Sequence, residues 1–147
     1  MSGIADAPAI ADYGLQFHHF GLAVSRPDLA VSFLRGLGYR IGETTHDPIQ
    51  NVYLVLCESE RAPAVEVIYS TGTPGPVDRI LSDHSELIYH LCFATFDLSD
   101  SLDRIRRGGH RIVCVSTPKP AVLFGGACVS FYQVKGWGLI EVLEAAS

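Results

Sequence analysis

The sequence contains an internal repeat that spans most of its 147 residues. At a constant offset of 71 residues, seven pairs of identical or similar residues align: His19 and His90, Ala23 and Ala94, Leu34 and Ile105, Arg35 and Arg106, Gly38 and Gly109, Arg40 and Arg111, and Ile41 and Ile112. The run VEVI (65–68) aligns with IEVL (140–143) at an offset of 75. A repeat of this kind indicates a duplicated supersecondary unit whose copies pack against each other.

Both copies have the same order of predicted elements. The alternating segment FHHFGLAV (17–24) predicts a strand, and Ser25 to Asp28, with Pro27 between them, is typical of a helix start. Three strand-like segments follow in each copy, which predicts an α+β fold with the order βαβββ twice. The length predicts a single domain over 1–147, with modules at about 16–70 and 87–144. The breaker-rich segment at 71–86 is the predicted linker.

Composition excludes several classes of protein. Apolar residues make up 48% of the chain and charged residues 18%, unlike a disordered chain. No apolar run approaches the roughly 18–20 residues of a membrane helix, so no membrane partner is expected. The net charge of −5 offers no basic surface for nucleic acid. The four cysteines form no CxxC pair and the N-terminus lacks a secretory signal, which predicts free thiols and a cytoplasmic location.

Two histidines and two glutamates occupy equivalent places in the repeat: His19 and His90, and Glu66 and Glu141. Each glutamate is flanked by Val or Ile within a strand, where a carboxylate is rarely buried without a partner or a cation. A single histidine or glutamate on a strand is most often a packed or solvent-facing residue, but the duplication favours convergence. Two imidazoles and two carboxylates suit one divalent cation, with zinc, nickel or cobalt preferred. Alternation places His18 on the opposite face from His19.

Four segments also occur in a recognisable order: FHHFGLAV (17–24), AVEVIYS (64–70) followed by GPVDRIL (75–81), ELIYHLCFAT (86–95), and the closing PKPAVLFGGACVSFYQVKGWGLIEVLE (118–144). Together they resemble the motifs of the vicinal oxygen chelate superfamily, also called the glyoxalase/bleomycin-resistance/dioxygenase group. The resemblance is greatest to methylmalonyl-CoA epimerase and glyoxalase I. It implies a curved mixed sheet around a central cleft, metal ligands at His19, Glu66, His90 and Glu141, and a homodimer.

The resemblance also implies a reaction. In this family the metal polarises substrate oxygens and thereby acidifies an adjacent C–H group. The expected function is that of a metal-dependent isomerase or lyase acting on a small α-oxo or acyl-thioester compound, with Glu66 and Glu141 as catalytic bases. We expect Cys92, Lys119 and Phe124 to contact the substrate. One departure is that Ile49 stands where epimerases carry a glutamate before Q-G-V, which places methylmalonyl-CoA epimerisation itself in question.

Two other functions fit a chain of this pattern. A non-catalytic small-molecule binding protein of the same fold, such as one that sequesters an antibiotic, would keep the cleft and lose the ligands. An extradiol-type dioxygenase would hold iron(II) with two histidines and one carboxylate. Glu66 argues against the dioxygenase, because a fourth protein ligand would occupy a position that oxygen or substrate needs.

Overall fold

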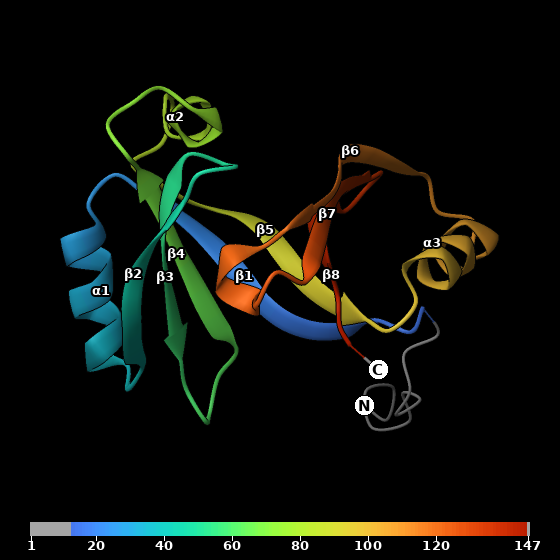
Figure 1. The fold of residues 1–147 in the computed structure, drawn as a ribbon, viewed down its shortest axis with the longest axis horizontal. Coiled ribbons are helices and arrows are strands. Elements are labelled where there is room, and N and C mark those ends of the chain that lie inside the picture. The colour runs from blue at the N-terminus through green and yellow to red at the C-terminus, as the bar shows by residue number, and fades with distance from the viewer. Residues whose placement is uncertain (1–12, 147) are drawn as a thin grey trace, which may run out of the picture.

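The computed structural model describes residues 13–146. Within this range, eight strands form one mixed sheet in the order β2-β3-β4-β1-β5-β8-β7-β6 (Figure 1). The strands are β1 (Gln16–Val24), β2 (Arg40–Asp47), β3 (Val52–Glu58), β4 (Ala64–Ser70), β5 (Glu86–Thr95), β6 (Ile112–Pro120), β7 (Cys128–Val134) and β8 (Gly138–Glu144). The helices are α1 (Pro27–Gly36), α2 (Pro76–Ile80) and α3 (Leu98–Arg107), with a 3₁₀ turn, η1 (Val122–Phe124).

The strand order is symmetric about the central pair of strands, β1 and β5. In the first half β1 pairs in parallel with β4, and in the second half β5 pairs in parallel with β8. The two halves join through the antiparallel pairing of β1 with β5. The predicted α+β fold of two tandem βαβββ modules is therefore confirmed. Residues at equivalent places in the repeat meet across this central junction, which is where His19 and His90 lie.

The two long helices begin where the sequence signals indicated. Helix α1 starts at Pro27, whose fixed φ and missing N–H suit the first turn. Helix α3 starts after Asp97, whose carboxylate accepts a hydrogen bond from the backbone N–H of Asp100. In α1 only Leu34 is buried, whereas Leu29, Phe33 and Leu37 of the same predicted apolar face remain exposed. Figure 1 places α1 and α3 at opposite ends of the sheet.

Alternation along the strands divides the core into two faces. On the helix-covered face, Val65 and Val67 pack with Leu34 in the first half, and Ile140 and Val142 pack with Ile105 in the second. The residues between them, Glu66 and Glu141, consequently point to the other face. On that face, Ile68 packs with Val77 of α2, and Leu143 packs with Cys92 and Phe124. The four candidate ligands therefore lie on the face away from α1 and α3.

Two elements are shorter or longer than the sequence indicated. Within the linker at 71–86, the run VDRILSDHSE (77–86) favours a short connecting helix, but only the single turn of α2 forms. The run HDPIQN (46–51) favours a turn, but strand β2 continues through His46 and Asp47. Among residues 13–146, no helix is long and apolar enough to cross a membrane.

Candidate metal centre

Strand register places the candidate ligands in two rows across the centre of the sheet. In one row, His19 pairs with Cys92 on β5, and Cys92 pairs with Glu141 on β8. In the other row, Gly21 pairs with both Glu66 on β4 and His90 on β5. The rows are equivalent under the repeat, so each places a small residue between a histidine and a glutamate.

The four side chains of these rows converge. The Nε2 atom of His19 lies 3.2 Å from Oε1 of Glu141 and 3.7 Å from Oε2 of Glu66. The Nε2 atom of His90 lies 3.4 Å from the same Oε1 of Glu141. Ligand atoms of His19, Glu66 and His90 all lie within 4.8 Å of one another. Donors from β1, β4 and β5 therefore form one compact group, and Glu141 of β8 lies beside both of its histidines.

These four side chains are buried, and four of their polar atoms have no hydrogen-bond partner among the described residues. His19 is 0% exposed, His90 2%, Glu141 3% and Glu66 5%. Within residues 13–146, five buried side-chain polar atoms have no hydrogen-bond partner, and four of them belong to His19, His90 and Glu141: the two Nε2 atoms, Nδ1 of His90 and Oε1 of Glu141. Unpartnered buried polar atoms are costly, and they are rare in folded proteins unless water or an ion satisfies them. The cluster thus has the unmet bonding capacity that a cation would fill.

Burial and local charge shift the two carboxyl groups in opposite directions. Burial, and then the negative charges of Glu141 and Asp47, raise the pKa of Glu66 well above its ordinary value. Burial also opposes ionisation of Glu141, but its contacts with His19 and His90 outweigh that cost and lower its pKa. Without a cation, Glu66 is therefore the member of the pair that takes up a proton more readily, and Glu141 is the one that ionises more readily.

The donor set fits a divalent metal ion. Two imidazole nitrogens and two carboxylate groups are ligands of borderline cations such as zinc, nickel and cobalt. The elements that hold them are strands at the centre of the sheet, which fix ligand positions better than loops. The buried group of His19, Glu66 and His90 could therefore bind a metal ion, with Glu141 in contact with both histidines.

His18 was expected to face away from His19, and that expectation is wrong. The pairing of β1 with β5 shifts register between Phe17 and His19. This bulge turns the His18 ring toward its neighbour, so that the Nδ1 atoms of the two imidazoles lie 2.8 Å apart. Burial, and then the adjacent charge of His19, lower the pKa of His18. Ligand atoms of His18, His19 and Cys92 also lie within 4.8 Å of one another.

The three predicted substrate contacts have different surroundings. Phe124 stacks on the His19 ring, with centroids 5.4 Å apart and an interplanar angle of 25°. Cys92 is fully buried between His19 and Glu141, where burial and the Glu141 charge raise the pKa of its thiol. Lys119 is at the end of β6 and lines a cavity. Phe124 and Cys92 therefore lie against the candidate ligands, whereas Lys119 lines a cavity that none of the four ligands borders.

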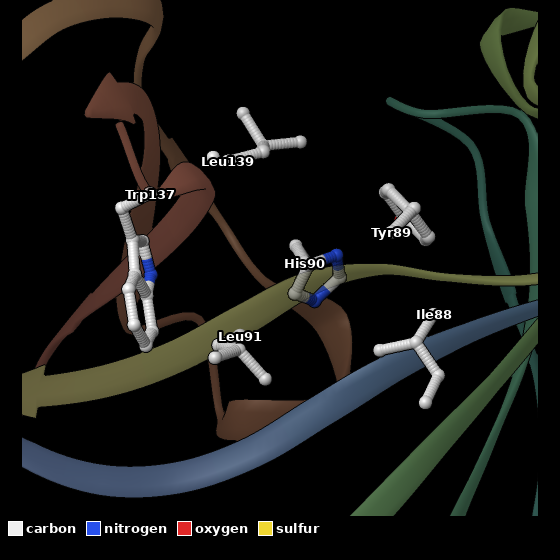
Figure 2. A pocket seen from close by; sticks show the side chains of 7 residues that line it. Ile88, Tyr89, His90, Leu91, Trp137 and Leu139 are labelled. Atoms are coloured by element: carbon white, nitrogen blue, oxygen red, sulfur yellow. The ribbon is translucent and has the colours of Figure 1, made fainter. Parts of the chain in front are cut away.

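That cavity, of about 490 Å³, lies between the two halves. Its inner wall includes Tyr89 and Phe131, whose rings pack edge-on against His90 with centroids 4.4 and 5.4 Å away. Apolar side chains from both halves form most of the remaining lining: Ile49, Val52, Val77, Ile80, Val115, Val129 and Leu139. Two cations, Arg79 and Lys119, also line it. His90 borders a second, shallower cavity of about 380 Å³ beside Trp137 and Leu139 (Figure 2).

Sequence reasoning did not place Asp47 at this site. Its side chain is 2% exposed, and its Oδ1 accepts hydrogen bonds of 2.9 and 3.2 Å from the backbone N–H groups of Ile49 and Gln50. Its negative charge contributes to the raised pKa of Glu66. The only signal in the sequence is the Asp-Pro pair, which typically opens a turn. Ile49 itself is 54% exposed and lines the cavity.

Comparison with known proteins places this geometry in a family. Residues 18–128 match the model of the Glyoxalase/Bleomycin resistance protein/Dioxygenase superfamily. The chain belongs to that superfamily. The matched range includes three of the four candidate ligands, and Glu141 lies beyond it. No curated protein matches the sequence significantly.

Several solved structures share this superfamily fold. Methylmalonyl-CoA epimerase from Mycobacterium tuberculosis matches with a TM-score of 0.70 and 21% identity, over 91% of this chain and 89% of that one. A hypothetical protein from Bacillus halodurans matches with a TM-score of 0.73 and 19% identity, over 90% and 96%. A variant of the Streptomyces coelicolor methylmalonyl-CoA epimerase, in complex with 2-nitronate-propionyl-CoA, matches with a TM-score of 0.67 and 21% identity. The match covers 90% of this chain and 98% of that one. At these identities the likeness shows the fold alone.

Proposed function

We propose that this protein is a metal-dependent isomerase or lyase that removes a proton next to a metal-chelated carbonyl group. The observation that carries the proposal is the convergence of buried, unpartnered Nε2 atoms of His19 and His90 on Oε1 of Glu141. Glu66 completes the set, and its carboxyl lies 3.7 Å from His19. A bound zinc, nickel or cobalt ion would supply Lewis-acid polarisation of a substrate oxygen. The adjoining cavity provides room for a small molecule.

The two glutamates suit proton transfer as well as ligation. Their environments push their pKa values apart, which is a pattern of acid–base pairs in active sites. A carboxyl group that ligates a metal ion is ionised, and of the two glutamates Glu66 has the more basic carboxylate, which makes it the better acceptor of a substrate proton. Because Ile49 carries no ionisable group, the candidates for moving the proton are these two residues and Asp47, whose charge acts on Glu66.

The lining of the cavity favours a particular class of substrate. Most of its wall is apolar, which suits an acyl or alkyl body. Arg79 comes from α2 and Lys119 from β6, and within residues 13–146 neither side chain makes an ion pair. Two cations of this kind favour a substrate with an anionic group. Two of the structural neighbours are methylmalonyl-CoA epimerases, which agrees with an anionic acyl thioester.

Proton exchange with solvent tests this function directly. The zinc- or cobalt-loaded protein is incubated in D₂O with candidate acyl thioesters and hemithioacetals, and deuterium at the carbon beside the carbonyl is followed by NMR. We expect enzyme-dependent incorporation that disappears in Glu141→Gln. A protein that binds these compounds in thermal-shift measurements without any exchange would instead be a binding module of the same fold. That result would contradict the catalytic proposal.

A further inference from the structure

The two histidines of the candidate centre have different partners at Nδ1. The Nδ1 atom of His19 lies 2.8 Å from Nδ1 of His18. The Nδ1 atom of His90 is buried and has no hydrogen-bond partner among the described residues. Tyr89 is equivalent to His18 under the repeat, and its ring packs edge-on against His90. The two halves of the site therefore differ: His19 has a hydrogen-bond partner at Nδ1, whereas His90 has none among the described residues.

A hydrogen bond between two imidazoles restricts where their protons lie. A neutral imidazole carries one N–H and one lone pair, so one Nδ1 atom of this pair donates and the other accepts. If His19 donates, its Nε2 keeps a lone pair, and that lone pair faces Glu66 and Glu141 across 3.7 and 3.2 Å. If His18 donates, the proton of His19 is on Nε2, and that nitrogen cannot bind a cation. Metal binding thus requires the first arrangement.

We propose that His18 is a positioning residue, which accepts the Nδ1 proton of His19 and so presents the Nε2 lone pair of His19 to the metal. The inference rests on the metal-dependent function proposed above. Phe124 fixes the geometry of the pair, because it stacks on the His19 ring and meets the His18 ring edge-on at 5.2 Å and 89°. Partners of this kind orient ligating histidines and contribute about 10–100-fold in metal affinity.

Metal affinity in matched variants tests the role of His18. His18→Phe keeps a ring beside Phe124 but removes the acceptor, and we expect it to weaken zinc binding by roughly 10–100-fold in competition titrations. His18→Asn places an amide oxygen near the position of Nδ1 and should restore most of the affinity. Tyr89→Phe is the control in the other half, and it should leave zinc affinity unchanged because His90 Nδ1 has no partner to lose.

Nitrogen-15 NMR of histidine-labelled wild type provides a second measurement that needs no variant. On addition of zinc, we expect a protonated Nδ1 and a metal-bound Nε2 at His19, with an unprotonated Nδ1 at His18. Equal zinc affinity in wild type and His18→Phe would overturn this inference alone. So would ligation through Nδ1 of His19, as expected for a cation held by His18, His19 and Cys92. If the wild type binds neither zinc, nickel nor cobalt, the proposed function itself fails.

Discussion

The ring of His90 lies directly over Gly21 on the neighbouring strand, so closely that a Cβ atom at position 21 would stand 2.6 Å from Nε2 of His90. Gly21 is therefore part of the geometry of the candidate centre, although it carries no side chain. Its equivalent in the second half is Cys92, whose thiol occupies the floor beside His19. The two halves thus share the candidate ligands but differ in the residue beside the histidine, which is Gly21 at His90 and Cys92 at His19.

Adding one methyl group at position 21 should displace the His90 ring. We expect Gly21→Ala to cost about 1–3 kcal/mol of folding stability through overpacking, and to weaken zinc binding. Gly36→Ala is the matched control, because no atom lies within 4 Å of its Cβ position and alanine favours the helix. Chemical denaturation measures the first effect and zinc titration the second. Unchanged zinc affinity in a folded Gly21→Ala protein would show that His90 does not need its observed position.

Removing the ionisable group of Glu66 should stabilise the metal-free protein. The folded-state pKa of Glu66 is raised, so its contribution to stability is full below its unfolded pKa, about 4.3, and is lost as pH rises through the folded pKa. Each unit of that shift corresponds to about 1.4 kcal/mol. Glu66→Gln avoids this loss. In thermal unfolding without metal, its advantage over wild type should therefore increase with pH.

The same Glu66→Gln variant should respond weakly to metal. Zinc stabilises a folded state that binds it, so wild type should show a clear rise in melting temperature that the variant largely lacks. A variant that is less stable than wild type without metal at every pH would contradict the buried, protonated state of Glu66.

Glu141 contacts both histidines, and its loss should affect the centre most. We expect Glu141→Gln to lower zinc affinity by more than the roughly 10–100-fold that loss of an outer partner costs, and to abolish deuterium exchange. Glu144→Gln, in the same strand, is the control and should retain both properties. Circular dichroism verifies that the fold persists. Normal exchange in Glu141→Gln would exclude Glu141 from the reaction.

Arg79 and Lys119 should affect substrate binding without affecting the metal. We expect Arg79→Gln and Lys119→Gln each to raise KM for an anionic thioester by about 5-fold, the value of roughly 1 kcal/mol for a solvent-accessible ion pair. The kcat for that substrate and the zinc affinity should stay unchanged. Arg107→Gln, on α3 outside this cavity, is the control. An effect confined to Arg107 would place the anionic group of the substrate at the helix instead.

The repeat made the main features of the fold predictable, together with the convergence of the four candidate side chains. Period-two alternation and the equivalence of two histidines and two glutamates were sufficient to predict convergence at the central strands. His18 was misplaced because the alternation rule fails at a β-bulge, and neither of its flanking residues, Phe17 and His19, is of a type that marks one. The burial of Asp47 could not be predicted, because it depends on hydrogen bonds to the following turn.

The cations of the cavity were also only partly predictable. Lys119 was identified from its place in the closing segment, but Arg79 lies in the connection between modules, and no local pattern brings α2 over the cavity. The exposed apolar side chains of α1 show a similar limit. Helical periodicity identifies the face that Leu29, Phe33 and Leu37 share, but not whether the sheet reaches far enough to cover it.

Anomalous diffraction from zinc-soaked crystals tests the central claim most directly. We predict a single strong peak bonded to Nε2 of His19, Nε2 of His90 and carboxylate oxygens of Glu66 and Glu141, at about 2.0–2.2 Å from each. The absence of a peak between these four side chains, or a zinc ion bound between His18, His19 and Cys92 instead, would contradict the account.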